Sequence, residues 1–222
     1  MVVCSTKFTT LNAVGEEEYT KEYGRGVEKY TFVFGFNSEE DLMSELKDKQ
    51  VLDAGSGAGN LKKDLGDEYN VTNLDIRHIP DSKSVQAMGE FMPFKDETFD
   101  TILCNHSLFY YGQDTEDVPL ENVIDMQGKE VFRVLKPGGR LHVILLPNNR
   151  NYENVPNEDS KFIVYTSVDR KNGNEYTSFP VLKILKEIGF DIDKAENFIT
   201  VHDDGYKHVQ TRAVLNKPEE SK

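Results

Sequence analysis

The sequence predicts an α/β fold in which a mostly parallel, doubly wound β-sheet carries helices on both of its faces. From residue 51 onward, short apolar runs alternate with amphipathic segments in the manner of repeated strand–helix–strand units. The first of these runs leads directly into a glycine-rich turn, VLDAGSGAGN at residues 51–60. Ligands of such sheets bind outside the carboxyl ends of the strands, so the turn marks the predicted site.

The composition is that of an ordinary globular protein of one domain, with 222 residues, 37% of them hydrophobic and 29% charged. A net charge of −13 disfavours a broad phosphate-contacting surface, and therefore a nucleic-acid partner. Cys4 and Cys104 are the only cysteines, which argues against a disulfide framework. No apolar stretch has the length of a membrane span and the start lacks the pattern of a signal peptide, so we expect a cytoplasmic protein without a membrane partner.

The elements of the first half follow in order. Residues 1–47 form an N-terminal helical segment, with helices predicted at 16–26 and at 38–49, and Ser38 is a typical N-cap. Strands are predicted at QVLDA, NVTNLDI and DTILCNHS, and a helix at NLKKDLGD.

The second half begins with a predicted helix over 121–136, which Pro-Gly-Gly at 137–139 ends before a strand over 140–147. A hairpin follows at 161–179, with Asn172-Gly173 as its turn, then an amphipathic helix to Gly189 and a closing strand over 208–217. The sequence thus predicts one domain over residues 48–217, with 148–180 as an insertion beside the predicted site, and a flexible tail at 218–222.

The residues around the turn restrict its ligand. A phosphate-binding P-loop requires a lysine and a hydroxyl residue that are missing, and the dinucleotide fingerprint requires a glycine where Asn60 stands. Asp53, just before Gly55, suits a cationic or zwitterionic ligand. Asp75, at a predicted solvent-accessible strand end, could accept hydrogen bonds from two ribose hydroxyls, a feature shared with NAD enzymes. The residues alone therefore favour a nucleoside without choosing one.

Four stretches together resemble the class I S-adenosylmethionine-dependent methyltransferases, closest to the branch that acts mostly on small molecules. They are VLDAGSGAGN, NLDI, MPFKDETFDTILCNHSLFY and EVFRVLKPGGRLHVI. The likeness runs from about residue 50 to 147 and is weaker beyond. It implies a Rossmann-like sheet of seven strands with an antiparallel C-terminal strand, S-adenosylmethionine as cofactor, and a small-molecule acceptor.

The resemblance also implies roles for individual residues. The methionine part of the cofactor lies against the turn, the ribose hydroxyls bind the acidic strand end, and the adenine lies beyond it. The family often has an aspartate that accepts from the adenine amino group where this chain has Met88, so a backbone carbonyl or a water must accept instead. The implied cofactor residues are Asp53, Gly55, Ser56, Gly57, Asp75, Ile76, Met88, Gly89, Glu90 and, through its backbone, Asn105.

The chemistry beyond the cofactor is left open by the sequence. His106 could be a general base or a histidine of the pocket wall, and Tyr19, Tyr23 and Arg25 could form a lid or an ordinary helical face. No spacing suggests a metal site. A methyltransferase acting on protein or RNA, or a cofactor-binding regulatory protein without turnover, are the alternative functions.

Overall fold

The computed structural model describes residues 6–9, 26–76, 84–109, 120–145, 166–169, 174–177, 181–202 and 207–219. The described helices are α1 (Val27–Phe34), α2 (Glu39–Leu46), α3 (Asn60–Leu65), α4 (Leu120–Val134) and α5 (Val181–Ile188). The strands are β1 (Thr6–Thr9), β2 (Gln50–Ala54), β3 (Asn70–Asp75), β4 (Val85–Gln86), β5 (Phe99–Cys104), β6 (Leu135–Leu145), β7 (Thr166–Asp169), β8 (Asn174–Thr177), β9 (Asp191–His202) and β10 (Lys207–Asn216).

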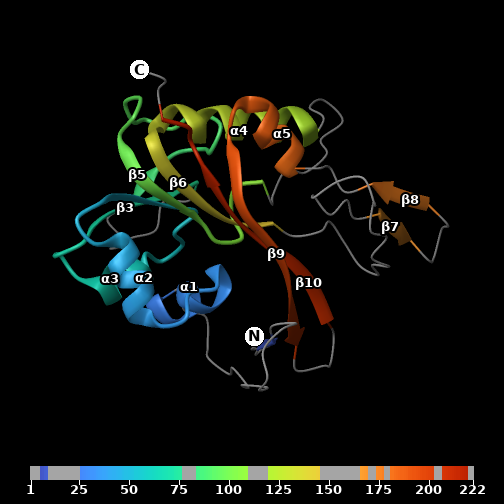
Figure 1. The fold of residues 1–222 in the computed structure, drawn as a ribbon, viewed down its shortest axis with the longest axis horizontal. Coiled ribbons are helices and arrows are strands. Elements are labelled where there is room, and N and C mark those ends of the chain that lie inside the picture. Colours follow the sequence, from blue (N-terminus) through green and yellow to red (C-terminus); the bar gives the residue numbers. More distant parts are fainter. Residues whose placement is uncertain are drawn as a thin grey trace.

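The main sheet has the order β1-β9-β10-β6-β5-β2-β3-β4 (Figure 1). Its centre from β6 to β4 is parallel, whereas β10 is antiparallel to both β6 and β9. The predicted fold class, including the antiparallel C-terminal strand, is confirmed. The described part of the sheet has eight strands rather than seven, because the four-residue β1 pairs with the outer strand β9.

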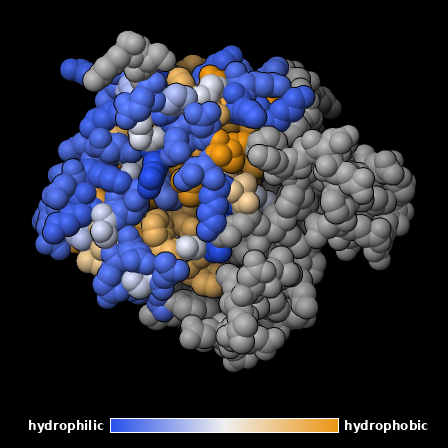
Figure 2. All heavy atoms as spheres, in the orientation of Figure 1, coloured by the Kyte–Doolittle hydropathy of each residue, from blue (hydrophilic) through white to orange (hydrophobic). Residues whose placement is uncertain are grey.

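Helices cover both faces of the sheet, as predicted. Figure 1 shows α4 and α5 together on one side and α1, α2 and α3 on the other. Two hydrophobic clusters correspond to these layers, one built with side chains of α4 and α5 and one with side chains of α1, α2 and α3. On the described surface in Figure 2, polar residues surround a smaller apolar area near the middle. Within the described residues no helix has the length and apolar character needed to cross a membrane.

Several predicted local features are confirmed. Ser38 caps α2, since its side chain accepts a hydrogen bond from the Asp41 backbone N–H at 3.2 Å. β7 and β8 pair antiparallel, which confirms the predicted hairpin, although its turn residues lie outside the described residues. Tyr19, Tyr23 and Arg25, the helix predicted before residue 26, and most of 148–180 also lie outside them.

The connection from α4 to β6 differs from the prediction. The helix ends at Val134 rather than residue 136, and β6 already pairs with β5 at Leu135. Pairing then breaks and resumes at Arg140. Within this irregular stretch Gly138 has φ 72°, and its N–H donates to the Lys217 carbonyl at 2.8 Å. The Pro-Gly-Gly sequence therefore forms a bulge within the strand, because Pro137 has no N–H for the ladder and Gly138 tolerates positive φ.

Arg133 of α4 holds the segment that connects β4 to β5. Its guanidinium donates to the carbonyls of Met92 and Phe94, at 3.0 and 2.8 Å, and to the carboxylates of Asp96 and Glu130. The hydrogen bond that Arg133 donates to the Glu130 carboxylate holds the pKa of that carboxyl below its ordinary value. Glu130 in turn accepts from the Met92 N–H at 2.9 Å. One side chain thus fixes a loop that has little regular structure of its own.

We predict that Arg133→Met lowers the free energy of unfolding by about 2 kcal/mol, because two backbone carbonyls and two carboxylates lose a charged donor. Lys129→Met is the matched control on the same helix, since among the described residues Lys129 forms an ion pair only with Asp125, on the exposed surface. It should cost less than about 0.5 kcal/mol. Urea denaturation measures both, and equal losses would contradict the assigned role of Arg133.

Candidate functional site

The glycine turn connects β2 to α3 and is fixed from β3. The N–H groups of Gly55 and Ser56 both donate to the Leu74 carbonyl, at 2.7 and 3.0 Å. Gly55 has φ 77°, and a Cβ placed there would lie 2.1 Å from the Ser107 Cβ. Glycine is therefore required at position 55 both by the backbone angle and by the close approach of the loop after β5.

Gly57 differs from Gly55 in its surroundings. It has φ 55°, yet a Cβ placed there would meet no heavy atom of the described residues within 4 Å. Packing against the described residues therefore does not explain why position 57 lacks a side chain. The geometry is that of a backbone that leaves room for a ligand to approach.

Asp75 lies directly beside this turn. Its Oδ2 accepts the Gly57 N–H at 2.9 Å, and the residue is 5% exposed. The expectation of a solvent-accessible strand end was wrong, because the carboxylate turns inward to bind the turn. A carboxylate has acceptor capacity for more than one donor, so this hydrogen bond is compatible with a second partner.

Ile76 and Met88 expose apolar side chains at the ends of two adjacent strands. They are 60% and 49% exposed, and each follows the last residues of β3 or β4. The Ala87 N–H donates to the Asp75 carbonyl at 3.1 Å and the Gln86 side chain to the Ile76 carbonyl at 3.2 Å, which holds the two ends together. Two exposed apolar side chains beside a polar turn are suited to the faces of a planar, weakly polar ring.

Gly89 contacts the loop after β5, and Glu90 is joined to that loop through Gln127 of α4. A Cβ at Gly89 would lie 2.2 Å from the Leu108 Cδ2. Glu90 Oε1 accepts from the Gln127 amide at 2.8 Å, and the Gln127 Oε1 accepts the Phe109 N–H at 2.7 Å. Gln127 was missed by the sequence analysis; the available signal was a polar residue in helical register between Val123 and Val131, on the inner face of α4.

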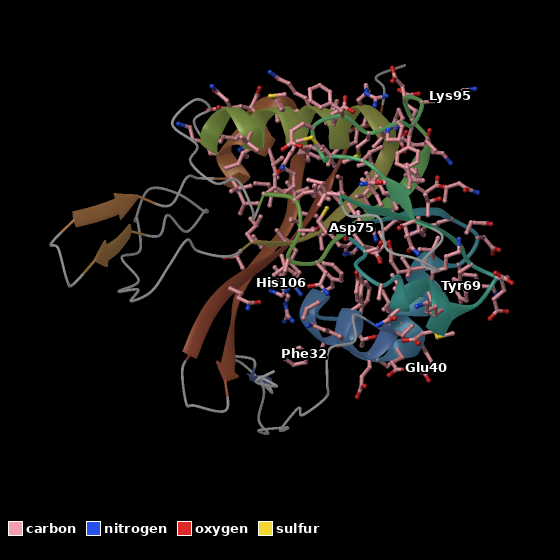
Figure 3. The ribbon with its side chains drawn as sticks, turned by 180° about the vertical axis from the view of Figure 1, so that it is seen from behind. Phe32, Glu40, Tyr69, Asp75, Lys95 and His106 are labelled. Atoms are coloured by element: carbon pink, nitrogen blue, oxygen red, sulfur yellow. The ribbon has the colours of Figure 1, made fainter. Side chains whose placement is uncertain are left out.

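The loop after β5 carries two non-glycine residues with positive φ, His106 at 51° and Phe109 at 66°. Such angles cost free energy and persist only where surrounding contacts impose them. Here the Ser107 hydroxyl donates to the Ala54 carbonyl, and His106 Nε2 lies 3.0 Å from the Gln210 Oε1 of β10. Figure 3 shows Asp75 and His106 in the middle of the molecule.

Asn105 begins this loop and is fully buried. Within the described residues, neither polar atom of its side-chain amide has a hydrogen-bond partner. A buried amide without a partner costs free energy, which a ligand or a water can recover. The site therefore holds polar capacity that the chain's own described groups do not use.

Asp53 is the second buried acid of the site. It is 0% exposed, and its Oδ1 accepts the Tyr30 hydroxyl at 2.6 Å. Burial, and then the nearby Asp53 carboxylate, raise the pKa of the Cys104 thiol, so this free cysteine stays protonated and is not a nucleophile. Tyr30 was missed by the sequence analysis, which did not predict α1. Among the described residues no cluster of histidine, cysteine or acidic side chains could hold a metal ion.

Residues 52–143 match a protein family described as a methyltransferase domain. An uncharacterized protein of Methanocaldococcus jannaschii is 28% identical over 82% of this chain and 84% of its own length. A sterol 24-C-methyltransferase of Neurospora crassa is 27% identical over 71% of this chain. A ubiquinone/menaquinone biosynthesis C-methyltransferase of Vibrio campbellii is 32% identical over 43% of it. The chain spans only 43% and 40% of the lengths of these last two relatives.

Solved structures show the same fold. A SAM-dependent methyltransferase of Methanosarcina mazei superimposes with a TM-score of 0.55 at 20% identity, covering 81% of this chain and 98% of the other. The 1,6-didemethyltoxoflavin-N1-methyltransferase of Burkholderia thailandensis, solved with S-adenosylhomocysteine, has a TM-score of 0.51 at 15% identity over 96% of this chain and all of its own.

We predict opposite behaviour for two single-methyl substitutions in the turn. Gly57→Ala should cost only about 1–2 kcal/mol of unfolding free energy, the penalty for positive φ, because its Cβ meets no atom in the part of the chain that the structure describes. Gly55→Ala adds a collision with the Ser107 side chain, so it should cost clearly more than Gly57→Ala. Urea denaturation of both variants decides this, and equal stability would show that Ser107 moves aside freely.

Proposed function

We propose that this chain is a methyltransferase of the class I type that uses S-adenosylmethionine as cofactor and methylates a small-molecule acceptor, in keeping with the methyltransferase domain that residues 52–143 match. The observation that carries the proposal is the turn itself, open at Gly57 and flanked by the buried acids Asp53 and Asp75. A cationic amino acid joined to a nucleoside is the ligand whose chemistry needs both acids.

The residues present fit this cofactor. Gly55, Ser56 and Gly57 would line its methionine part with Asp53 beside them, and Asp75 would accept from the ribose hydroxyls. The exposed side chains of Ile76 and Met88 would lie against the adenine. The adenine amino group would donate to a backbone carbonyl or a water, because Met88 offers no oxygen.

The proposed roles of Gly89, Glu90 and Asn105 follow from their surroundings within the protein. The Glu90 carboxylate already accepts a hydrogen bond from the Gln127 amide. We therefore propose that Gly89 and Glu90 shape the wall beside the adenine edge. Asn105 is assigned a backbone contact, and its buried amide offers a further donor and acceptor. The wall around the adenine is thus joined to the loop after β5.

The cofactor supplies an activated methyl group on a sulfonium that is already a good leaving group. The work of the chain is to align the acceptor, exclude water and, where the acceptor needs it, remove a proton. His106 is our candidate for the proton acceptor. The amide oxygen of Gln210 can only accept, so His106 Nε2 carries the hydrogen and Nδ1 is the basic nitrogen of the neutral ring.

A small-molecule acceptor is supported by the named relatives, which include sterol and quinone methyltransferases, and by the net charge of −13. The charge disfavours RNA. A screen with methyl-labelled cofactor against small-metabolite, protein and RNA fractions tests the proposal. Label transferred to the small-metabolite fraction supports it, and label found only in protein or RNA would contradict it.

Asp75 gives a prediction that separates the ligand from the fold. Asp75→Asn keeps an oxygen for the Gly57 N–H but loses the charge, whereas Asp75→Ala loses both. Each should weaken S-adenosylhomocysteine binding by about 2–4 kcal/mol, because charge-assisted hydrogen bonds to the ribose are lost. Only the alanine variant should also lose about 1–2 kcal/mol of stability. Calorimetry and thermal unfolding measure the two effects; a folded Asp75→Asn that binds as tightly as wild type removes Asp75 from the cofactor site.

His106→Asn tests the proposed base. Asparagine tolerates positive φ, so the strained position and cofactor binding should be nearly intact. Turnover with the acceptor found by the screen should fall at least about 10²-fold, and the acidic limb of the pH–rate profile should disappear. Near-normal turnover with that limb unchanged would instead make His106 part of the pocket wall.

A further inference from the structure

α1 contacts the strand that leads into the glycine turn, although this helix lies outside residues 52–143, the range of the matched family. Tyr30, near the middle of this helix, is 0% exposed, as is Asp53. The Tyr30 hydroxyl donates to Asp53 Oδ1 at 2.6 Å across 23 positions of sequence. The contact reaches the acid that stands directly before the turn.

A second contact joins the start of α1 to the helix that follows the turn. The Val27 N–H donates to Asp64 Oδ2 at 3.1 Å, and Asp64 belongs to α3, the helix that follows the turn. A Cβ at Gly26 would lie 2.1 Å from that oxygen, so the chain enters α1 through a glycine. α1 therefore bridges the strand before the turn and the helix after it.

Burying the Asp53 carboxylate beside the turn costs free energy of folding. Removing a carboxylate from water costs several kcal/mol, and apolar side chains of similar volume pack at least as well. The phenol offsets part of that cost by donating to the charged oxygen, and a charged acceptor makes the bond stronger than a neutral one. A cationic ligand at the turn would stabilise the carboxylate further.

We propose that Tyr30 is a positioning residue for the cofactor: its hydroxyl holds the Asp53 carboxylate, charged and correctly oriented, for the ammonium group of the cofactor's amino-acid part. α1 and the cofactor then stabilise one another, because each favours the same position of Asp53. This inference rests on the cofactor roles of the proposed function and assigns a site role to the N-terminal helix.

The test compares two ligands that differ in the amino-acid part. S-adenosylhomocysteine carries it, and 5′-methylthioadenosine has the same adenosine and sulfur without it. Tyr30→Phe should weaken the first about tenfold, which is about 1.4 kcal/mol, and leave the second unchanged. Equal weakening of both ligands, or of neither, in calorimetry would overturn the proposal.

Val33→Ala is the matched control, since Val33 is a fully buried residue of the same helix that packs in the hydrophobic cluster of α1, α2 and α3. It should lower the melting temperature without changing the ratio of the two dissociation constants. A changed ratio in Val33→Ala would show that any loosening of α1 is sufficient, and would overturn the specific role of the phenol.

Two further measurements keep the proposal testable. Asp53→Asn combined with Tyr30→Phe should bind S-adenosylhomocysteine no worse than Asp53→Asn alone, because the phenol then has no charge to hold. In the wild type, S-adenosylhomocysteine should slow hydrogen exchange of the amides of residues 30–34 and 5′-methylthioadenosine should not. Equal protection by both ligands contradicts the proposal. A wild type that binds neither ligand contradicts the proposed function itself.

Discussion

The site depends on hydrogen bonds that join the turn after β2 to the end of β3. Gly55, Ser56 and Gly57 all donate their backbone N–H groups to β3, the first two to the Leu74 carbonyl and the third to the Asp75 carboxylate. The turn is therefore not a loop with a shape of its own. Its shape follows from the parallel pairing of β2 with β3, which sets where the two strands end.

The loop after β5 closes the other side of the same turn. Ser107 occupies the space that a side chain at Gly55 would need, and its hydroxyl binds the Ala54 carbonyl. Gln127 of α4 then joins the Phe109 backbone to Glu90. Through these contacts α4 supports the proposed adenine edge, while Tyr30 of α1 contacts Asp53 from the other face of the sheet. Each helical layer supports a different part of the proposed cofactor.

The sequence predicted the frame well, because its signals are local. Apolar runs, the glycine turn and Asp75 at the end of a strand are read from neighbouring residues, and the structure confirms the strands that they mark. What it missed depends on distant partners. β9 carries many charged residues and pairs at the outer part of the sheet, so its apolar pattern is weak. Tyr30 and Gln127 gain their roles only from contacts made by the folded chain. The burial of Asp75 was missed for the same reason, since it follows from Gly57 turning back toward β3.

The strain in the loop after β5 shows how such a frame can serve varied chemistry. Positive φ at His106 and Phe109 costs about 1–3 kcal/mol each, because neither position is a glycine. The conformation persists because β2, α4 and β10 each hold one residue of the loop, through Ala54, Gln127 and Gln210. Groups held from three elements are already aligned when a reactant arrives, and alignment is most of what an in-line methyl transfer requires of a protein. Because that alignment is set by the sheet and its helices, segments outside the frame could determine the acceptor of the proposed reaction without disturbing the place where the methyl group would be presented.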